Sequence, residues 1–370
     1  MELLETAWRC FRNLEPSRRQ WRPGLNVFLG PNGSGKTNIL ESINVLSGWG
    51  AFPVSGSRVS SMITWDFEEK RAFLSGRASG ERDLEITAQI GERLSLRISD
   101  ERVTYSELRA LLPSLSFLPG DMNLLDGSPS VRRLFLDKLC ALCFPLYARR
   151  LAEYRQLVRQ RTALLRRDGG GSVPISFALK ASTLPIAQMG GWIRRARQKA
   201  VDLLSEKLSI ESSSFESDIL PFSVNVAMEL RGGNIENFEL EYCIEDLRSA
   251  LDADVERELR AGLVLVGPHR DDLTFSCLGR PAALTLSRGQ KRRVVMAAVL
   301  AAGRLIETKL RLKPILILDD VTAELDSEGR ALMGRAIVAT GWQVFATGVE
   351  NPFRTADATM WYVRDGKITC

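Results

Sequence analysis

The pattern of hydrophobic and polar positions changes twice along this chain of 370 residues. In residues 1–120, the apolar run LNVFL at 25–29 predicts a buried strand, and the spacing of NILESINVLS after it predicts a helix. The alternating stretches 84–90 and 94–99 predict a hairpin with Gly91 in its connection. Strands and short loops around one helix favour an α/β or α+β arrangement for this part.

Residues 121–262 have a different, mostly helical pattern. Leucines recur at helical intervals over 130–167, with almost no strand signal. The glycine-rich stretch 168–172 predicts a flexible loop, and 191–208 predicts a second helical stretch. A short β-like stretch at 222–230 precedes more helix. This part is expected to be an inserted helical lobe.

Strand and turn patterns return in residues 263–370. LVLVG at 263–267 predicts a strand, a long helix follows SRGQ, and QVFATG predicts another strand. The unbroken apolar run in PILILDD is typical of a central parallel strand buried on both faces. The simplest organisation is one α/β domain formed by 1–120 and 263–370, interrupted by the helical insertion at 121–262.

Composition places the chain among globular proteins, since 45% of its residues are apolar and its formal charge of +5 is modest. The N-terminus carries Glu2 and Glu5 where a secretory signal would be basic and then apolar, and no apolar run reaches the roughly 20 residues of a membrane helix. A cytoplasmic protein without membrane contact is expected. Cys140 and Cys143 form C-x-x-C without a second pair, so two thiols on one face of a buried helix are favoured over a metal or redox site.

A glycine-rich phosphate loop follows the first buried strand. Gly30, Gly35, Lys36 and Thr37 complete G-x-x-x-x-G-K-[ST] between a strand and a helix. Backbone N–H groups of such a loop wrap phosphates, the lysine reaches the terminal phosphates, and the threonine hydroxyl can bind Mg²⁺. A chance glycine turn is the alternative, which the flanking elements disfavour. The predicted nucleotide-binding residues here are Gly30, Pro31, Asn32, Gly33, Ser34, Gly35, Lys36, Thr37 and Asn38.

Two acidic residues end the predicted strand ILIL. A nucleotide site that uses Mg²⁺ needs a carboxylate at the end of a neighbouring buried strand. Asp319 is predicted to hold the metal through its water shell, and Asp320 to polarise the attacking water, with Lys36 as the second catalytic residue. An ordinary Asp-Asp turn is the alternative, which the phosphate loop disfavours.

A second anion-binding turn stands far from this loop, in LTLSRGQKRR at 284–293. The first backbone N–H groups of a helix have no partner, so Ser-x-Gly-Gln at a helix start suits an anion. Ser287, Gly289 and Gln290 resemble the signature motif of ABC-type ATPases, in which the signature of one protomer closes over the nucleotide of another. That resemblance implies a homodimer with two composite sites.

The long interval between Lys36 and Asp319 carries further motifs. These residues are 283 positions apart, too many for a compact transporter ATPase, and the interval lacks the sustained heptads of long coiled-coil ATPases. The motifs of this chain are FRN (11–13), GPNGSGKTN, GSPSVRRLFLD (127–137), Y-x-x-x-L-x-x-Y at 147–154, QRTALLRR (160–167), GPHRDDL (267–273) and LDDVTAELD (318–326). Together they resemble the RecF family of bacterial recombination-mediator ATPases across nearly the whole chain.

The resemblance implies an α/β fold, an ABC-type P-loop ATPase head with an inserted helical lobe, with ATP and Mg²⁺ as cofactors. It implies that an ATP-bound homodimer clamps double-stranded DNA near gaps or junctions, acts with RecR and RecO, and helps to load RecA. Slow, DNA-stimulated hydrolysis would reset the clamp. Carried over by motif, Asp326 faces the partner protomer, and Arg12 and Asn13 lie where related ATPases approach the nucleotide.

Three positions depart from related patterns. WGAFPV at 49–54 replaces an Arg-Ser-Phe-Arg type segment, and FLPGD has Gly120 where a glutamate is more usual. These departures put local details of DNA contact or nucleotide sensing in question. Thr347 stands where transporter ATPases carry a switch histidine, so hydrolysis is expected to be slow.

The helical insertion carries a strong local charge. Between Val131 and Arg167, ten lysines and arginines oppose two acids, which gives +8 (10 − 2). Because phosphate neutralisation dominates DNA affinity without base contacts, this surface suits sequence-independent binding. A solvated helix face is the alternative, and some arginines could face the ATPase domain or the partner. The predicted DNA-binding residues are Arg132, Arg133, Arg149, Arg150, Arg155, Arg159 and Arg161.

The single histidine, His269 in GPHRDD, is interpreted as structural because no nucleophile pairs with it. Arg270 and the two aspartates after it are a hypothesis for linking the inserted lobe to the nucleotide state. Two other functions compete with the preferred one. A transporter-energising ATPase would need a membrane partner and a switch histidine, and a scaffold with a vestigial nucleotide site would not need the complete set of motifs found here.

Overall fold

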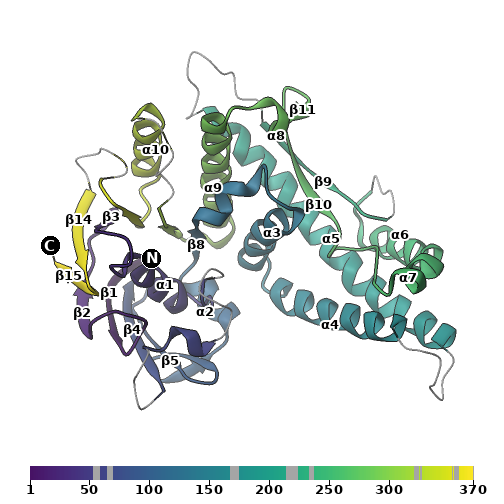
Figure 1. Cartoon of the computed structure of the whole chain (residues 1–370), viewed down its shortest axis with the longest axis horizontal. Coiled ribbons are helices and arrows are strands. Elements are labelled where there is room, and N and C mark those ends of the chain that lie inside the picture. The colour runs from purple at the N-terminus through teal and green to yellow at the C-terminus, as the bar shows by residue number, and fades with distance from the viewer. Residues whose placement is uncertain are drawn as a thin grey trace. The chain divides into compact units, whose positions relative to one another are not determined.

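The computed structural model describes residues 1–52, 59–64, 70–166, 175–213, 224–232, 237–320, 325, 327–351, 353 and 358–369 (Figure 1). The loop predicted at 168–172 and the predicted interface residue Asp326 lie outside the described residues. The chain divides into two compact units. Unit 1 comprises Met1–Met122, Ile210–Phe222 and Leu286–Cys370, and unit 2 comprises Asn123–Ser209 and Ser223–Thr285.

An antiparallel sheet forms one layer of unit 1, with the strand order β2-β1-β4-β5-β6-β7. Its strands alternate buried and exposed residues, most regularly in LEITAQI, because one face of the sheet meets the core. The hairpin predicted at 84–90 and 94–99 is confirmed as β5 and β6. The strand bounds are β1 Glu2–Arg9, β2 Ser17–Gln20, β4 Ala72–Ser79, β5 Leu84–Ile90, β6 Leu94–Ile98 and β7 Glu101–Val103.

The second sheet of unit 1 has the order β15-β14-β3-β13-β12-β8, and its strands from β14 to β8 are parallel to their neighbours. β15 pairs antiparallel with β14. Every residue of β3 and of β12 is buried, which confirms LNVFL and PILIL as central strands. The bounds are β3 Leu25–Leu29, β8 Ser114–Phe117, β12 Ile315–Leu318, β13 Val344–Gly348, β14 Ala358–Arg364 and β15 Lys367–Thr369.

Helix α1 (Lys36–Leu46) packs against strands of both sheets. Its buried residues Ile39, Leu40 and Ile43 belong to one hydrophobic core with side chains of the two sheets. This packing holds the N-terminus of α1 beside the carboxyl ends of the parallel strands, where α/β folds bind ligands. The other helices of unit 1 are α2 Tyr105–Leu111, α9 Arg288–Leu310, α10 Ser327–Thr340 and the 3-10 turn Val59–Met62, while a second 3-10 turn covers Pro119–Leu124.

Unit 2 is mostly helical, as the pattern of 121–262 predicted. A three-stranded sheet of order β11-β10-β9 packs beside the helices, with α3 and α8 against β10. Within the described parts of both units, no helix is long and apolar enough to cross a membrane. The bounds are α3 Pro129–Cys143, α4 Tyr147–Leu165, α5 Ile175–Ser213, α6 Leu240–Ala253, α7 Val255–Ala261, α8 Ala282–Thr285, β9 Val224–Glu229, β10 Asp272–Cys277 and β11 Arg280–Pro281.

The predicted strand at 263–267 is wrong. These residues are irregular backbone after α7 ends at Ala261 with Gly262 as its C-cap, although Val264 and Val266 are buried. Their alternation reflects packing under a loop, and the strand begins at Asp272 as β10. Because β10 pairs with β9, the chain stays in unit 2 until Thr285, so the second unit ends later than the predicted boundary at 262.

Candidate functional site

The phosphate loop connects the central strand β3 to α1. Gly33 and Gly35 have left-handed backbone, with φ of +79° and +109°, which favours glycine. A Cβ on Gly30 would lie 2.2 Å from the backbone oxygen of Val363, so the adjacent strand β14 leaves no room for a side chain there. The sequence therefore folds into a loop that exposes backbone N–H groups in front of the helix N-terminus.

Two buried polar groups of this loop suit a phosphate ligand. The Lys36 ammonium donates to the carbonyl oxygens of Gly30 and Pro31, at 2.7 and 2.9 Å, and burial lowers its pKa below the ordinary value. The hydroxyl of Ser34 is buried and has no hydrogen-bond partner within the described structure. A buried hydroxyl without a partner is costly, and phosphate oxygens arriving at the loop would satisfy it.

The carboxylate of Asp319 meets the loop at the end of β12. The hydroxyl of Thr37 donates to both oxygens of Asp319 at 3.0 Å, across 282 positions of sequence. The hydroxyl of Thr347, at the end of β13, donates to Asp319 at 2.7 Å and accepts the backbone N–H of Asp320 at 2.9 Å. Burial raises the pKa of Asp319, and the hydrogen bonds from Thr347 and Thr37 oppose this rise.

This oxygen pair fits a hard cation. A hydroxyl beside a carboxylate, next to a phosphate loop, is the donor set that Mg²⁺ takes in nucleotide sites. Asp320, the carboxylate predicted to polarise the attacking water, is exposed and has a left-handed φ of +48°. Such backbone in a residue other than glycine is strained and occurs often at functional sites.

Asn13 braces the loop from a neighbouring turn. Its amide donates to the carbonyl oxygen of Gly33 at 3.1 Å and accepts the side-chain amide of Asn38 at 2.7 Å. Arg12, predicted to approach the nucleotide, instead forms a two-pronged ion pair with the buried Glu41, at 2.6 and 2.9 Å. The Arg12 guanidinium therefore ties its own turn to α1, which carries Glu41.

A cavity of about 400 Å³ lies in front of the loop. The loop residues, both aspartates, Pro119 and Thr347 line it, so the FLPGD segment also reaches the site. Pro119 and Thr347 were not among the predicted site residues, although FLPGD was related to nucleotide sensing and Thr347 to the position of a switch histidine. Because β8 and β13 both pair in parallel with β12, their carboxyl ends lie beside Asp319.

The SRGQ turn is the start of α9. Ser287 is the N-cap: its hydroxyl accepts the backbone N–H of Gln290, and the Gln290 side chain accepts the backbone N–H of Ser287. No acidic residue occupies the first turn, and Ser287 and Gly289 are exposed. A Cβ on Gly289 would meet no described atom within 4 Å, so packing inside this chain does not require the glycine.

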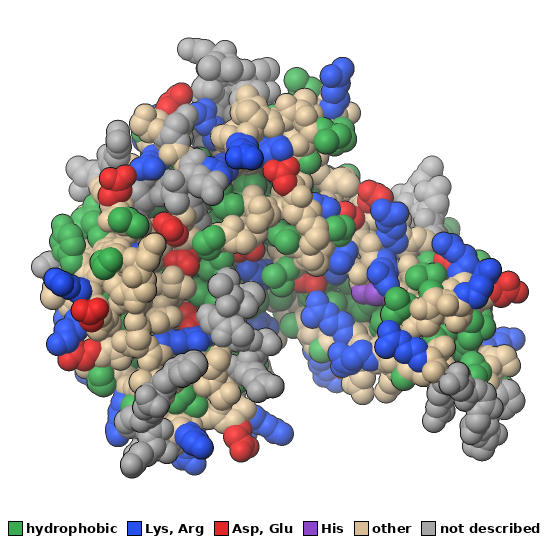
Figure 2. Space-filling view, in the orientation of Figure 1, with side chains coloured by type: hydrophobic (Ala, Val, Ile, Leu, Met, Phe, Trp, Pro, Cys, Tyr) green, Lys and Arg blue, Asp and Glu red, His purple; other side chains and the backbone are tan. Residues whose placement is uncertain are grey.

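The predicted DNA-binding arginines differ in how far they are exposed. Arg149, Arg155 and Arg159 are exposed on α4, with side-chain exposures of 78% for Arg149 and 56% for Arg155. Arg150 is half-buried and lies over the ring of Trp192, at 4.5 Å from its centroid. Figure 2 shows lysine and arginine side chains grouped on the face of unit 2 that carries the histidine.

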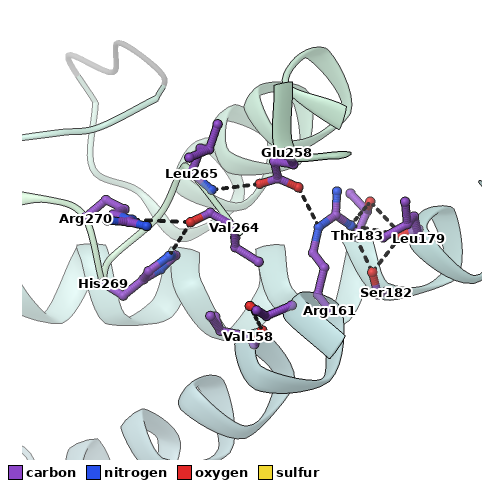
Figure 3. A network of polar contacts seen from close by, with 11 residues as sticks. Val158, Arg161, Leu179, Ser182, Thr183, Glu258, Val264, Leu265, His269 and Arg270 are labelled. Carbon is purple, nitrogen blue, oxygen red and sulfur yellow. Dashed lines mark hydrogen bonds and ion pairs between the residues drawn. The ribbon is translucent and has the colours of Figure 1, made fainter. Parts of the chain in front are cut away.

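Arg161 and Arg132 are corrections to the predicted DNA surface. Arg161 is completely buried, where it pairs with the equally buried Glu258 at 2.9 Å and donates to three oxygens of α5 (Figure 3). Arg132 forms a two-pronged ion pair with Asp272, both bonds 2.8 Å long. These two side chains hold unit 2 together because their charges face carboxylates of the same chain.

The histidine is structural, as interpreted from the sequence. His269 shares a hydrogen bond of 2.7 Å with the hydroxyl of Tyr154. It shares another of 3.1 Å with the carbonyl oxygen of Val264 (Figure 3). Burial lowers the pKa of His269 to about 4, so the ring is neutral at pH 7. Cys140 is buried in α3, and within the described residues no group of three or more His, Cys, Asp and Glu side chains could hold a metal ion.

The comparisons with known proteins agree with this geometry. The family model described as the RecF/RecN/SMC N terminal domain matches residues 3–365. A protein of Moorella thermoacetica named DNA replication and repair protein RecF is 32% identical over 348 residues, covering 92% of this chain and 88% of that protein. The Heliobacterium modesticaldum protein of the same name is 29% identical over 377 residues, covering 97% and 96%.

Two kinds of solved structure share the fold. The recombination mediator protein RecF with ATPrS, described as part of the RecFOR pathway, superposes with a TM-score of 0.87 at 23% identity, covering 99% of this chain and 97% of that one. An Smc head bound to the C-winged helix domain of ScpA superposes with a TM-score of 0.55 at 16% identity, covering 99% and 96%. The predicted ATPase-head fold is therefore confirmed.

Proposed function

Because this chain belongs to the RecF family, we propose that it is an ATP-dependent DNA-binding protein of replication and repair. The observation that carries the proposal is the meeting of Thr37 and Asp319, which joins the phosphate loop to the acidic strand end. An ATPase needs these two motifs side by side, and a scaffold with a vestigial site would have no reason to keep them so.

Different groups of the loop would contact different parts of the nucleotide. Backbone N–H groups of the loop and the Ser34 hydroxyl would hold the phosphates, and Lys36 would leave its carbonyl acceptors for the terminal phosphates. Mg²⁺, held by Thr37 and Asp319, would neutralise phosphate charge. Asp320 would accept a proton from the attacking water, which its exposed position at the cavity permits.

The N-terminus of α9 would complete the site of a second protomer. Ser287 and Gly289 are exposed, no acid stands in the first turn, and glycine there costs helix stability without any packing reason in this chain. A close approach by another molecule's phosphate explains all three features. ATP held between two protomers would stabilise a two-fold dimer by mass action. Slow hydrolysis of ATP would then dissociate the dimer, so that ATP acts as a switch.

The basic face of α4 would bind duplex DNA through its phosphates. Arg149, Arg155 and Arg159 are exposed along one helix, so they can neutralise phosphates without reading bases. The relatives named for replication and repair, and the solved structures described in the RecFOR pathway, support RecR and RecO as protein partners. Help in loading RecA is the proposed outcome. Duplex DNA with a single-strand gap is the proposed substrate.

Sedimentation with ATP, with ADP and without nucleotide, each with and without gapped duplex, tests assembly and DNA binding together. ATP should produce a dimer that co-sediments with DNA. Ser287→Arg should retain ATP binding and lose dimerisation, whereas Lys36→Arg should weaken ATP binding or turnover. A Ser287→Arg protein that dimerises normally with ATP would show that the signature does not act across protomers.

ATP turnover with and without duplex separates this function from its competitors. Slow turnover that DNA accelerates is expected here. A scaffold would show no turnover, and a transporter-type ATPase would turn over without any response to DNA. Asp320→Asn should abolish turnover and leave ATP-dependent dimerisation, because it removes the proton acceptor and keeps the phosphate loop.

A further inference from the structure

A second concave site lies in unit 2. Its cavity of about 370 Å³ is lined by Arg133, Arg231 and Arg270, together with Ser128 and Ser130 at the start of α3. No aspartate or glutamate is among the described lining residues. Three guanidinium groups around one hollow repel each other, so an anion placed there would relieve the repulsion.

A buried carboxylate brings the three arginines together. Asp271 is 1% exposed, its carboxylate accepts the backbone N–H of Arg231 at 2.8 Å, and its carbonyl oxygen accepts the Arg133 side chain at 2.8 Å. Arg270 precedes Asp271 directly. Arg194 donates to both carboxylate oxygens of Asp271 at 2.9 Å and also pairs with Asp246 at 3.2 Å. Asp271 therefore organises the cluster, while Arg194 offsets part of its negative charge.

A tight turn sets the position of Arg270. The backbone N–H groups of Arg270 and Asp271 both donate to the carbonyl oxygen of Gly267, at 2.8 and 3.2 Å. Gly267 has a φ of +118°, and a Cβ there would lie 2.5 Å from the Tyr154 hydroxyl, so only glycine fits. The Arg270 Nε donates to the carbonyl oxygen of Val264 at 3.3 Å, as Figure 3 shows, which directs the side chain. The arginine is thus held in place before any ligand binds.

The start of α3 adds donors to the same cavity. Ser128 is the N-cap but its hydroxyl makes no capping bond, and no acidic residue stands in the first turn of this helix of 15 residues. Among the described residues, the exposed Glu229 lies 3.4 Å from Arg231, and such an exposed pair is weak. Burial, and after it the charge of Arg197, lower the pKa of Arg133, while the charges of Asp272, Asp137 and Asp271 oppose this shift.

We infer that this cavity of Arg133, Arg231 and Arg270 binds a phosphate group. Guanidinium forks match the oxygens of phosphate in pairs, and the uncapped helix start supplies further donors and a favourable dipole. The phosphate could belong to a DNA strand, which would place a strand of the proposed substrate at a defined point of unit 2, or to a free phosphate compound. The DNA source rests on the proposed function, whereas the phosphate site itself does not.

Two exposed arginines allow a test that leaves the fold intact. The variants are Arg231→Gln, Arg270→Gln and the double variant, with Arg257→Gln as control. The Arg231 side chain is 62% exposed and the Arg257 side chain is 67% exposed on α7 of the same unit, paired with Asp254. Thermal unfolding of each variant establishes that it is folded. Duplex binding is then measured over a salt series, and inorganic phosphate binding is measured by calorimetry at constant ionic strength.

Each single variant at the cavity should lose about tenfold in affinity for its phosphate ligand, since a charge-assisted hydrogen bond is removed. With a DNA strand as the source, the double variant should also lose about 0.9 from the slope of log affinity against log salt, as one phosphate contact disappears. With a free compound as the source, wild type but not the double variant should bind inorganic phosphate, and duplex binding should stay unchanged. Either result supports the site and identifies the ligand.

The inference is overturned if the double variant matches Arg257→Gln in both duplex affinity and phosphate binding. If wild type binds no duplex at all, the proposed DNA function fails while the calorimetric arm still decides on the phosphate site. Suppose that wild type binds duplex, that the double variant binds it equally well, and that calorimetry detects no phosphate binding to wild type. The cavity is then not a phosphate site, and the DNA function stands.

Discussion

The buried ion pair of Arg161 and Glu258 gives the sharpest stability prediction. Both side chains are 0% exposed, and they join α4 to α7 at 2.9 Å within unit 2 (Figure 3). Glu258 also accepts the backbone N–H of Leu265 at 3.0 Å, so the pair anchors the segment that leads into the GPHRDD turn. Arg161→Met keeps the aliphatic bulk and removes the charge.

The expected loss of stability in Arg161→Met follows from the buried polar groups that lose their partner. In Arg161→Met the Glu258 carboxylate stays buried with one remaining donor, the N–H of Leu265. The carbonyl oxygen of Leu179 still accepts the hydroxyl of Ser182, so it adds little. An unpaired buried charge costs about 3–5 kcal/mol, and the free energy of unfolding of unit 2 should fall by that amount. Arg161→Met with Glu258→Leu should recover most of the loss, because an apolar pair often replaces a buried ion pair without penalty.

Urea unfolding combined with hydrogen exchange of α4 and α7 measures this change in unit 2. Arg159→Met is the matched control, since Arg159 is exposed on the same helix and should change stability by less than about 0.5 kcal/mol. Folded Arg161→Met should bind duplex DNA as wild type does, while Arg159→Met should bind more weakly. Equal stability of the two variants, or a loss of DNA affinity in Arg161→Met alone, would refute the assignment of Arg161 to the interior.

Three further predictions concern pH, the nucleotide site and a glycine. The native state keeps His269 neutral with a pKa of about 4 against an ordinary value of 6.5, so unit 2 should lose up to roughly 3 kcal/mol as pH falls through this window. Urea titrations at several pH values check this, and His269→Gln should abolish that part of the dependence. Thr347→Val removes a hydrogen-bond donor to Asp319, so ATP turnover should drop about tenfold with ATP binding little changed. The pKa of Asp319 should rise, so the acid limb of the pH profile of turnover should move to higher pH. Unchanged turnover would contradict the role of this hydroxyl. Gly267→Ala should lower the melting temperature of unit 2, with a cost above about 1 kcal/mol, because its φ is +118° and its Cβ would meet the Tyr154 hydroxyl.

Local patterns were enough to predict the nucleotide motifs. The phosphate loop is one run of residues between a strand and a helix. Gly33 and Gly35 are required by their own φ angles, whereas Gly30 is required by a tertiary contact with Val363. ILILDD was recognised as a central strand because burial on both faces demands an unbroken apolar run. SRGQ contains both residues of the capping box, so the start of α9 could also be predicted from adjacent residues.

The LVLVG stretch shows where periodicity misleads. Its valines at 264 and 266 are buried as a strand would bury them, yet no neighbouring strand pairs with them in the described structure. Alternation records which side chains are buried, whereas a strand also needs a partner for its backbone groups. That partner is a property of the assembled fold, and it exists for β10 and not for 263–267.

The sequence by itself determined which chemical groups this protein has and which motifs they form: the phosphate loop, the aspartates after ILIL and the basic helices of the insertion. Only the tertiary structure decided how those groups are used. Arg161 and Arg159 are two residues apart on one helix, but Glu258, 97 positions from Arg161, turns one into a buried structural ion while the other stays in solvent. Thr347 and Asp271 likewise gain their roles from partners distant in sequence. The physical reason is that burial and hydrogen bonding depend on which segments pack together, and a charge pattern along the chain does not record that.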